Sequence, residues 1–281
     1  MSPIQIIRCS SPKRFQRGAP KHFYASGTLT YGMRAAEWDA IADHYHEQII
    51  SPLRESTYNP LWKHIDRMRV TKIRCLELGC GTGELLADLA NRFESVEGFD
   101  FSARMVERAK DRTRQLQNVH VRQGDMRRLQ FPPSSFDAVI TVNSLLAKSE
   151  RTINGIVKNI FQVLRPGGMF LGILPAMEPY IYQRMLAVDY GRRQSKSQTL
   201  DFSRGIIDFD GSKQKAFYRF ELGYRFGRAG FGNFSIERVP YSWKAWKEAG
   251  QPAFRKESPP WDWFLACQKP VGENEVEPGG I

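Results

Sequence analysis

The sequence has few of the features that mark membrane, disulfide-rich or metal-binding proteins. It contains no apolar run near the roughly 20 residues that cross a bilayer, which predicts no membrane segment. Its 281 residues include four cysteines, and these show neither paired spacing nor a Cys-x-x-Cys pattern. They are Cys9, Cys75, Cys80 and Cys267. We therefore expect free thiols in a reducing compartment and no metal site.

Acidic residues are absent from the amino end. Residues 1–34 hold six Lys or Arg and no Asp or Glu, residues 35–150 hold 16 basic against 17 acidic residues, and residues 151–281 hold 19 against 13. The net charge of +11 therefore arises in the two flanks. Such flanks attract RNA or an anionic substrate, or keep a protein soluble. Dense runs of Lys and Arg, which are typical of nucleic-acid binding, are missing.

Residues 1–30 lack helical and strand periodicity, and they also lack the apolar core of a secretion signal. We predict an irregular basic arm and a cytoplasmic protein. An acid-poor end is also typical of organellar import sequences, and import through this arm is the alternative. However, Pro3, Pro12 and Pro20 interrupt the amphipathic helix that such sequences form.

What the sequence does contain is a strand, a glycine-rich turn and a helix start. Apolar residues from Ile73 run into glycines at 79, 81 and 83, and a helical pattern begins at Glu84. Glycine lets the backbone turn sharply and lets a ligand approach the main chain, where the free N–H groups of the new helix face it. The pattern alone fits both a nucleotide-type site and an ordinary turn.

The segments around this turn alternate between helix and strand. Residues 31–70 show helical patterns that predict two helices forming an amino-terminal cap. Beyond the turn we predict strands at 96–100, 119–122, 136–142 and 168–174, and helices at 103–116 and 153–164. Such alternation predicts a parallel sheet covered by helices on both faces. The glycine turn then lies at the carboxyl end of the first strand, where open α/β sheets bind ligands.

The alternation stops after Leu174. The predicted elements are a helix at 178–190, a polar mobile segment at 191–199, a hairpin at 206–218 around Asp210-Gly211, a helix at 220–229, and strands at 234–239 and 261–267. We interpret residues 175–218 as a substrate lid inserted after the fifth strand, with a surface decoration as the alternative. Residues 270–281 are predicted to be a disordered tail.

The motifs resemble, in order and spacing, those of class I S-adenosylmethionine-dependent methyltransferases over residues 70–175. The matching segments are Leu76-Glu-Leu-Gly-Cys-Gly-Thr-Gly83, Gly98-Phe-Asp-Phe-Ser102, Gly124-Asp-Met126, Phe136-Asp-Ala-Val139 and Leu164-Arg-Pro-Gly-Gly168. The resemblance implies a Rossmann-like, mostly parallel sheet of seven strands with an antiparallel final hairpin. It also implies a methyltransferase domain at 71–269 and S-adenosylmethionine as cofactor.

The resemblance also implies roles for the acids at the strand ends. Asp100 would accept the ribose hydroxyls, and Asp125 would address the adenine ring, with Met126 as an apolar surface beside it. A helix cap is the alternative for Asp100 and a turn residue for Asp125. Glu77, inside the first strand, would meet loop amides or reach the cofactor's ammonium group through water.

Other expected cofactor contacts follow from the same motifs. The segment from Trp38 to Tyr45 is similar to a helix found before the first strand in small-molecule members, where the tyrosine closes over the methionine end of the cofactor. An ordinary packed aromatic is the alternative for Tyr45. The remaining expected contacts are Gly79, Cys80, Gly81, Gly83, Phe101 and Asn143.

The catalytic group is the least defined part of the site. Family members often carry a histidine shortly after the fourth strand, and here Asn143-Ser-Leu-Leu-Ala-Lys148 has none. The candidates are His44, His46 and Asn143. An aromatic acceptor pocket is expected from Tyr180, Tyr182, Phe217, Tyr241 and Trp243, with ordinary packing as the alternative. Arg192, Arg193 and Lys196 fit an anionic acceptor group or a solvated loop.

The sequence therefore predicts a methyltransferase that acts in line on an oxygen or nitrogen atom of a small molecule, as a monomer or homodimer. The first alternative is RNA methylation, which the basic flanks favour and the absence of an Asn-Pro-Pro-Tyr-like motif disfavours. The second is a non-catalytic S-adenosylmethionine-binding partner subunit, which the missing histidine leaves open.

Overall fold

A computed structural model describes residues 35–49, 51–68, 74–189, 198–209, 212–248 and 257–271. The predicted arm and residues 272–281 of the predicted tail lie outside these ranges, as do Arg192, Arg193 and Lys196. Within the described ranges no helix is long and apolar enough to cross a bilayer.

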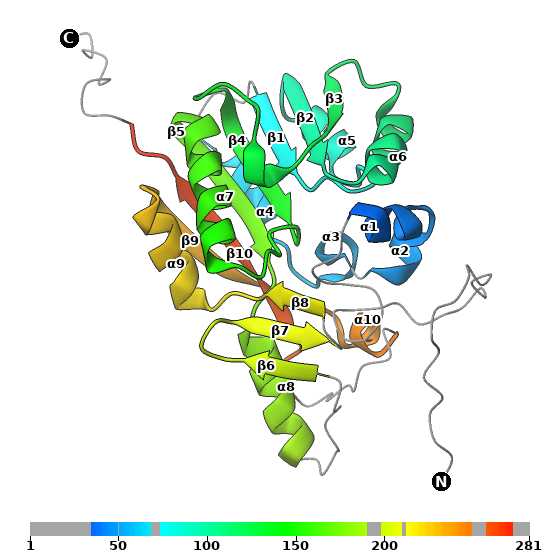
Figure 1. Cartoon of the computed structure of the whole chain (residues 1–281), viewed down its shortest axis with the longest axis vertical. Coiled ribbons are helices and arrows are strands. Elements are labelled where there is room, and N and C mark those ends of the chain that lie inside the picture. The colour runs from blue at the N-terminus through cyan, green and yellow to red at the C-terminus, as the bar shows by residue number, and fades with distance from the viewer. Residues whose placement is uncertain are drawn as a thin grey trace.

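The fold is built on a seven-stranded sheet with the strand order β3-β2-β1-β4-β5-β10-β9 (Figure 1). The first five strands pair in parallel, and β10 pairs antiparallel with both β5 and β9. The strands are β1 Arg74–Leu78, β2 Ser95–Asp100, β3 Val119–Gln123, β4 Phe136–Val142, β5 Leu164–Leu174, β9 Gly232–Pro240 and β10 Trp261–Gln268. The predicted mostly parallel sheet with an antiparallel final hairpin is confirmed.

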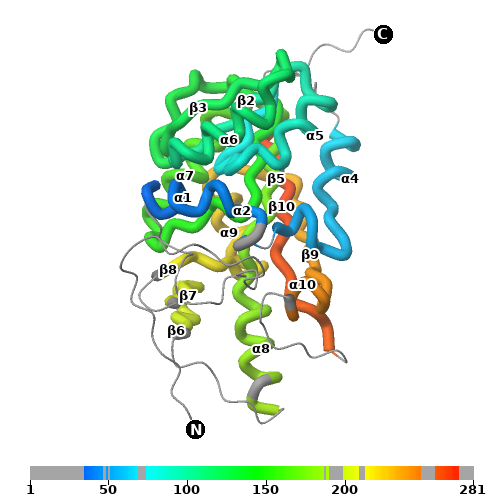
Figure 2. The backbone as a smooth tube through the Cα atoms, turned by 90° about the vertical axis from the view of Figure 1, so that its right-hand side faces the viewer, coloured from blue at the N-terminus to red at the C-terminus, as the bar shows by residue number. Residues whose placement is uncertain are grey.

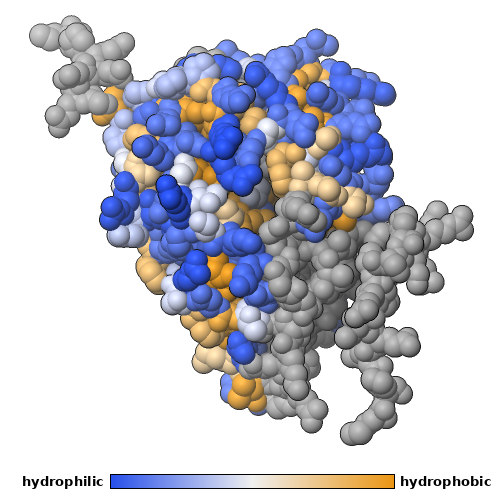
Figure 3. All heavy atoms as spheres, in the orientation of Figure 1, coloured by the Kyte–Doolittle hydropathy of each residue, from blue (hydrophilic) through white to orange (hydrophobic). Residues whose placement is uncertain are grey.

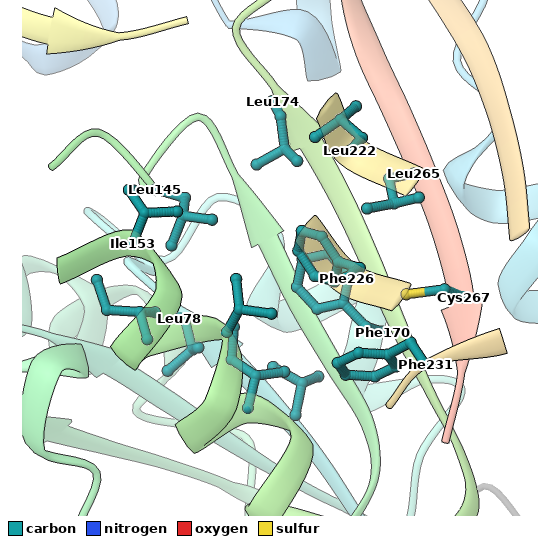
Figure 4. Packing of buried hydrophobic residues seen from close by; sticks show 14 of the residues in the cluster. Leu78, Leu145, Ile153, Phe170, Leu174, Leu222, Phe226, Phe231, Leu265 and Cys267 are labelled. Atoms are coloured by element: carbon teal, nitrogen blue, oxygen red, sulfur yellow. The ribbon is translucent and has the colours of Figure 1, made fainter. Parts of the chain in front are cut away.

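Helices cover both faces of the sheet, because successive strand residues point to opposite sides. In β1, Leu76 and Leu78 join the core beneath α7 and α9, while Cys75 joins the core beneath α4, α5 and α6. Figure 4 shows the first of these cores, where Phe170 of β5 and Phe226 of α9 face each other. The helices are α4 Leu61–Asp66, α5 Leu86–Ala90, α6 Ala103–Thr113, α7 Glu150–Val163 and α9 Arg219–Arg228.

Two serines set the starts of the long helices. The Ser102 hydroxyl accepts a hydrogen bond from the Met105 N–H at 3.1 Å, so α6 begins where the sequence predicts. Ser149 caps α7 in the same way through Thr152 N–H. The predicted start of this helix at residue 153 is therefore wrong by three residues, because apolar periodicity does not register a polar first turn.

The amino-terminal cap differs from the predicted pair of helices. Short segments replace the first one: α1 Ala35–Ile41, a 3-10 turn Ala42–His44, α2 Tyr45–Gln48 and α3 Pro52–Glu55. His44, with φ −121° and ψ 16°, departs from helical geometry and separates α2 from the preceding turn. Figure 2 shows α1 and α2 between the ends of the parallel strands and the smaller sheet.

The insertion after β5 forms a helix and a second, three-stranded antiparallel sheet. Its elements are α8 Glu178–Asp189, β6 Gln198–Asp201, β7 Ile206–Phe209 and β8 Ser212–Lys215. The sequence prediction misses β6, whose composition is polar. It also places the second hairpin strand too late, because Phe217 leaves the hairpin and donates its N–H to Pro175 O at 2.7 Å. Helix α10 Trp243–Glu248 is not predicted either.

In Figure 3, most of the coloured surface, which belongs to the residues that the structure describes, is hydrophilic. Apolar residues gather in the lower part of this view, over the small sheet and α8. Exposed apolar side chains of this region include Met185 and Val188 on α8 and Phe202 between β6 and β7.

Buried charges fasten the insertion to the main domain. Lys215 of β8 is 2% exposed, and its Nζ lies 2.8 Å from Glu221 Oε1 on α9 and 3.7 Å from Glu150 Oε1 on α7. It also donates to the Arg204 carbonyl at 2.5 Å. Arg225 pairs with both acids, at 2.6 Å from Glu150 Oε2. The small sheet is therefore held against α7 and α9 by its last strand.

Replacing Lys215 with methionine is expected to lower the free energy of unfolding by about 3 kcal/mol, the low end for removing one partner of a buried ion pair, because Arg225 still neutralises Glu221. Urea denaturation measures this change. The matched control is Lys213→Met in the same strand, where an exposed lysine 3.7 Å from Asp208 should contribute under about 1 kcal/mol. Equal effects of the two variants would contradict a fastening role for Lys215.

Candidate active site

A cavity of about 580 Å³ opens at the carboxyl ends of β1, β2 and β4, beneath α1 and α2. This volume suits a small-molecule site. The cavity is lined by Ala35, Trp38, Tyr45, Gly79, Gly81, Phe99, Asp100, Phe101, Met105, Gly124, Asp125, Met126, Arg127, Val142, Asn143, Ser144, Leu146, Ala147, Lys148, Ser149, Thr152 and Ile156.

The glycine turn forms one wall of the cavity. Gly79, Gly81 and Gly83 have φ values of +70°, +53° and +77°, which favour glycine. A Cβ on Gly79 would lie 2.2 Å from the Cβ of Ser144, and a Cβ on Gly83 would lie 3.1 Å from Ala109. The turn is therefore packed closely against the loop after β4 on one side and against α6 on the other.

Asp100 is the acid that holds this wall together. It ends β2, is 7% exposed, and lines the cavity. Its Oδ2 accepts the Gly81 N–H at 3.0 Å and its Oδ1 accepts the Ser102 N–H at 2.9 Å. Burial raises its pKa, although these amide hydrogen bonds lower it. Each carboxylate oxygen has a second lone pair, which suits the acceptance of two neighbouring hydroxyl groups.

Another part of the cavity lining combines apolar side chains with an acid. Phe101, with 37% of its surface exposed, and Met126 line it together with Asp125. Asp125 caps the 3-10 turn Met126–Arg128, and its two oxygens accept the N–H and the Nε–H of Arg127 at 2.8 and 2.7 Å. The Arg127 guanidinium lowers the pKa of this acid. Asp125 therefore acts as a turn residue, which is the alternative predicted for it. It also lies beside Phe101 and Met126, whose apolar side chains could pack against a ring.

Acidic groups gather at the glycine-turn side of the cavity, with Asp100 in its lining and Glu77 buried behind it. Glu77 is buried, and burial, followed by the charges of Asp100 and Glu84, raises its pKa well above the usual range. Its Oε2 has no hydrogen-bond partner among the described residues. Tyr45 lines the cavity, and its pKa is also raised by burial and then by Glu84 and Asp100. A cationic ligand would favour the ionised forms of these clustered acids. S-adenosylmethionine carries two cationic groups, a sulfonium and an ammonium.

Asn143 forms the floor where β4 ends. It has a φ of +47°, an uncommon conformation outside glycine, and its N–H donates to Ile173 O at 2.8 Å. Its Nδ2 donates to Asp262 Oδ2 at 2.7 Å, and the Tyr241 hydroxyl donates to the same oxygen at 2.5 Å. Asp262 is fully buried in β10, and burial raises its pKa to about 6.

The structure brings most predicted site residues together at this cavity. Of the predicted cofactor contacts, Tyr45, Gly79, Gly81, Asp100, Phe101, Asp125, Met126 and Asn143 line it, whereas Glu77, Cys80 and Gly83 lie behind its wall. Neither predicted histidine lines it. His44 is exposed, and His46 Nε2 lies 3.3 Å from Thr82 Oγ1 and 2.8 Å from Arg112. Their catalytic role stays a prediction that their positions do not favour.

Sequence reasoning misses the residues contributed by the start of α7 and by β10. Lys148, Ser149 and Thr152 line the cavity because α7 begins directly after the loop that follows β4. A signal for them exists, since Ser149-Glu150 is a helix start at the ligand edge of the sheet. Asp262 could also have been noticed, as an acid within the otherwise apolar run Trp261-Asp-Trp-Phe-Leu.

Comparison with known proteins places this cavity in context. Residues 75–168 match the model of a methyltransferase domain family. The chain is 36% identical over 121 residues to a demethylmenaquinone methyltransferase of Leptospira interrogans, with 41% of this chain and 48% of the relative covered. It is 35% identical over 113 residues to a trans-aconitate 2-methyltransferase of Deinococcus radiodurans, covering 40% of this chain and 41% of the relative.

A crystal structure of an S-adenosylmethionine-dependent methyltransferase from Methanosarcina mazei has the same fold, with a TM-score of 0.53 and 18% identity. That comparison covers 76% of this chain and 99% of the other. The first curated relatives are matched over less than half of their length, 49% and 38%.

Residues 75–168 therefore match a methyltransferase domain, and the chain has the fold of S-adenosylmethionine-dependent methyltransferases, consistent with the class I superfamily. S-adenosylmethionine is the cofactor expected of it, and the cavity fits that ligand: it is lined by Asp100 and a glycine turn and by the apolar side chains of Phe101 and Met126.

Proposed function

We propose that this protein transfers a methyl group in line from S-adenosylmethionine to an oxygen or nitrogen atom of a small molecule. The observation that carries the proposal is the cavity in which Asp100, the glycine turn and Asn143 converge. The methyltransferase relatives support the reaction class, and because they are named for different substrates they do not identify the acceptor of this protein.

The residues that would hold the cofactor have separate tasks. Asp100 would accept the ribose hydroxyls, Phe101 and Met126 would pack against the base, and Glu77 would face the ammonium group through the glycine turn. When bound, S-adenosylmethionine supplies an electrophilic methyl group on a sulfonium. Because that group is already activated, the protein contributes chiefly by fixing the acceptor in line and excluding water.

The insertion supports a small acceptor, in keeping with its predicted role as a lid. It is fastened to α7 and α9 through Lys215, and its apolar residues Ile207 and Ala216 pack with Met177 beneath the carboxyl edge of β5. Leu146 belongs to this apolar cluster and also lines the cavity. The cavity wall at Leu146 thus backs onto a buried apolar cluster that the insertion shares, and an apolar wall suits an apolar or aromatic acceptor better than a nucleic-acid strand.

The acceptor class can be tested by supplying tritium-labelled methyl donor to the purified protein together with a cell extract. We expect label in small molecules that pass an ultrafiltration membrane, resist ribonuclease and separate from the donor by chromatography, and that are absent when the protein is left out. Label held in ribonuclease-sensitive material would overturn the small-molecule proposal. Transfer that requires a co-purifying chain would favour the partner-subunit alternative.

The dependence of the transfer rate on salt concentration also distinguishes a small-molecule acceptor from RNA. Transfer to a neutral small acceptor should change little between about 50 and about 200 mM salt, whereas RNA binding through several phosphate contacts falls by orders of magnitude over that range. The measurement is the initial rate of label transfer at limiting acceptor, with S-adenosylhomocysteine binding at each salt concentration as the control. A steep fall in rate with unchanged cofactor binding would favour RNA.

A further inference from the structure

The side-chain amide of Asn143 is hydrogen-bonded through its nitrogen but not through its oxygen. Its Nδ2 donates to Asp262, whereas its Oδ1 is buried and accepts no hydrogen bond from the residues that the structure describes. A buried acceptor without a partner costs about 1–3 kcal/mol. Asn143 also lines the cavity, so a ligand whose donor group reaches Oδ1 would remove this cost.

The position of Asn143 relates it to the reacting end of the cofactor. Phe101, Met126, Asp125 and Asp100 all line the cavity, and under the proposed function the first three lie at the base and Asp100 at the ribose. Asn143 belongs instead to the loop that closes on Gly79, since a Cβ on Gly79 would collide with Ser144. This is the methionine end, where the sulfonium and its methyl group would lie.

We infer that Asp262 is a positioning residue, which holds the Asn143 amide so that Oδ1 accepts a hydrogen bond from the N–H or O–H of the group that receives the methyl. The inference rests on the proposed function and adds to it a substrate class, acceptors that present a donor hydrogen at the attacking atom. It also explains why an asparagine occupies a left-handed backbone position at the end of β4.

The surroundings of Asp262 fix its protonation state, and with it the orientation of the amide. The Tyr241 hydroxyl, the Asn143 amide and the Ala176 N–H all donate to its carboxylate, and Tyr180 of α8 faces it from the insertion. Burial nevertheless raises its pKa to about 6, above the ordinary 3.8. Above this pH the ionised carboxylate can only accept, so it selects the Nδ2 end of Asn143.

Below pH about 6 the proton binds Asp262, and its O–H can donate to Asn143 Oδ1. Because Nδ2 faces Asp262 in the present arrangement, this bond requires the amide to turn, which places its NH₂ toward the cavity. Asn143 can then donate a hydrogen bond to a ligand but no longer accept one. The acceptor capacity of Asn143 should therefore be present above pH about 6 and absent well below it.

Sinefungin probes this directly, because it carries an amine in place of the sulfonium methyl group, whereas S-adenosylhomocysteine has neither. We expect sinefungin to gain roughly tenfold in affinity relative to S-adenosylhomocysteine between pH 5 and pH 8, the worth of one charge-assisted hydrogen bond. Calorimetry with both ligands measures the ratio, in which effects of Glu77 or Asp100 on the shared part of the ligands cancel.

Substitutions test whether the change of the affinity ratio with pH comes from Asp262. Asp262→Asn should make the affinity ratio independent of pH, and Tyr241→Phe should move the midpoint upward, because the ionised carboxylate loses a donor. The exposed Asp66→Asn should leave the profile unchanged. A wild-type ratio that does not change with pH, or one that still changes in Asp262→Asn, would overturn the inference. Absence of S-adenosylhomocysteine binding would instead overturn the proposed function.

If Asp262→Asn does not fold, the wild-type profile and Tyr241→Phe still decide the matter. Thermal unfolding followed by circular dichroism checks each variant beforehand. Tyr241→Phe with an unshifted midpoint would contradict a role for the Tyr241–Asp262 pair.

Discussion

Replacing Asp100 with alanine is expected to weaken S-adenosylhomocysteine binding at least about 100-fold. The carboxylate would form two charge-assisted hydrogen bonds to the ribose, each worth about 1.5–3 kcal/mol, and it also fixes the amides of Gly81 and Ser102. Both contributions are lost in the variant. Isothermal titration calorimetry measures the change.

The conservative variant separates the two contributions. Asp100→Asn keeps one oxygen that can accept the Gly81 or Ser102 N–H but removes the charge, so binding should fall by less than in Asp100→Ala. Asp100→Ala also leaves the Gly81 and Ser102 N–H groups without this acceptor, so thermal unfolding is measured beside binding to show that the variant is folded. Undiminished binding in Asp100→Ala would place the ribose elsewhere.

Replacing Gly79 with alanine should affect both stability and binding. The added Cβ would lie 2.2 Å from Ser144 Cβ, and a φ of +70° is itself unfavourable for alanine. Left-handed strain costs roughly 1–2 kcal/mol and overpacking roughly 1–3 kcal/mol more, so the free energy of unfolding should fall by about 3 kcal/mol. Cofactor binding should fall as well, because the turn must shift. Urea denaturation and calorimetry measure the two effects.

Two other glycines provide matched controls. A Cβ on Gly81 would meet nothing within 4 Å, so Gly81→Ala should cost only the left-handed strain of about 1–2 kcal/mol. Gly155 lies within α7 and its Cβ also meets open space, so Gly155→Ala should stabilise the protein by about 1 kcal/mol. If Gly79→Ala is no more disruptive than Gly81→Ala, the tight contact with the loop after β4 is not present in solution.

The parts of this protein that sequence predicts best depend on short-range patterns. The strand, the glycine turn and Asp100 lie within about one βαβ unit, where a fixed order of elements brings the turn and the acid to the same sheet edge. Ser102 is recognisable as a helix cap from its neighbours alone. Most predicted cofactor residues therefore line the cavity.

The parts that sequence does not predict depend on contacts between distant segments. Asn143 and Asp262 are hydrogen-bonded although 119 residues separate them, and Tyr241 joins them from β9's far end. Strand β6 is polar and is stabilised by pairing with β7, which local propensity does not register. The sequence makes His46 a catalytic candidate because histidine in general titrates near neutral pH, but in the fold its Nε2 contacts Arg112 of α6.

The most direct test of the account is calorimetric titration of the full-length protein with S-adenosylhomocysteine. We predict one molecule bound per chain, with affinity lost in Asp100→Ala and kept in Asp66→Asn. A folded wild-type protein that binds neither S-adenosylhomocysteine nor S-adenosylmethionine would contradict it.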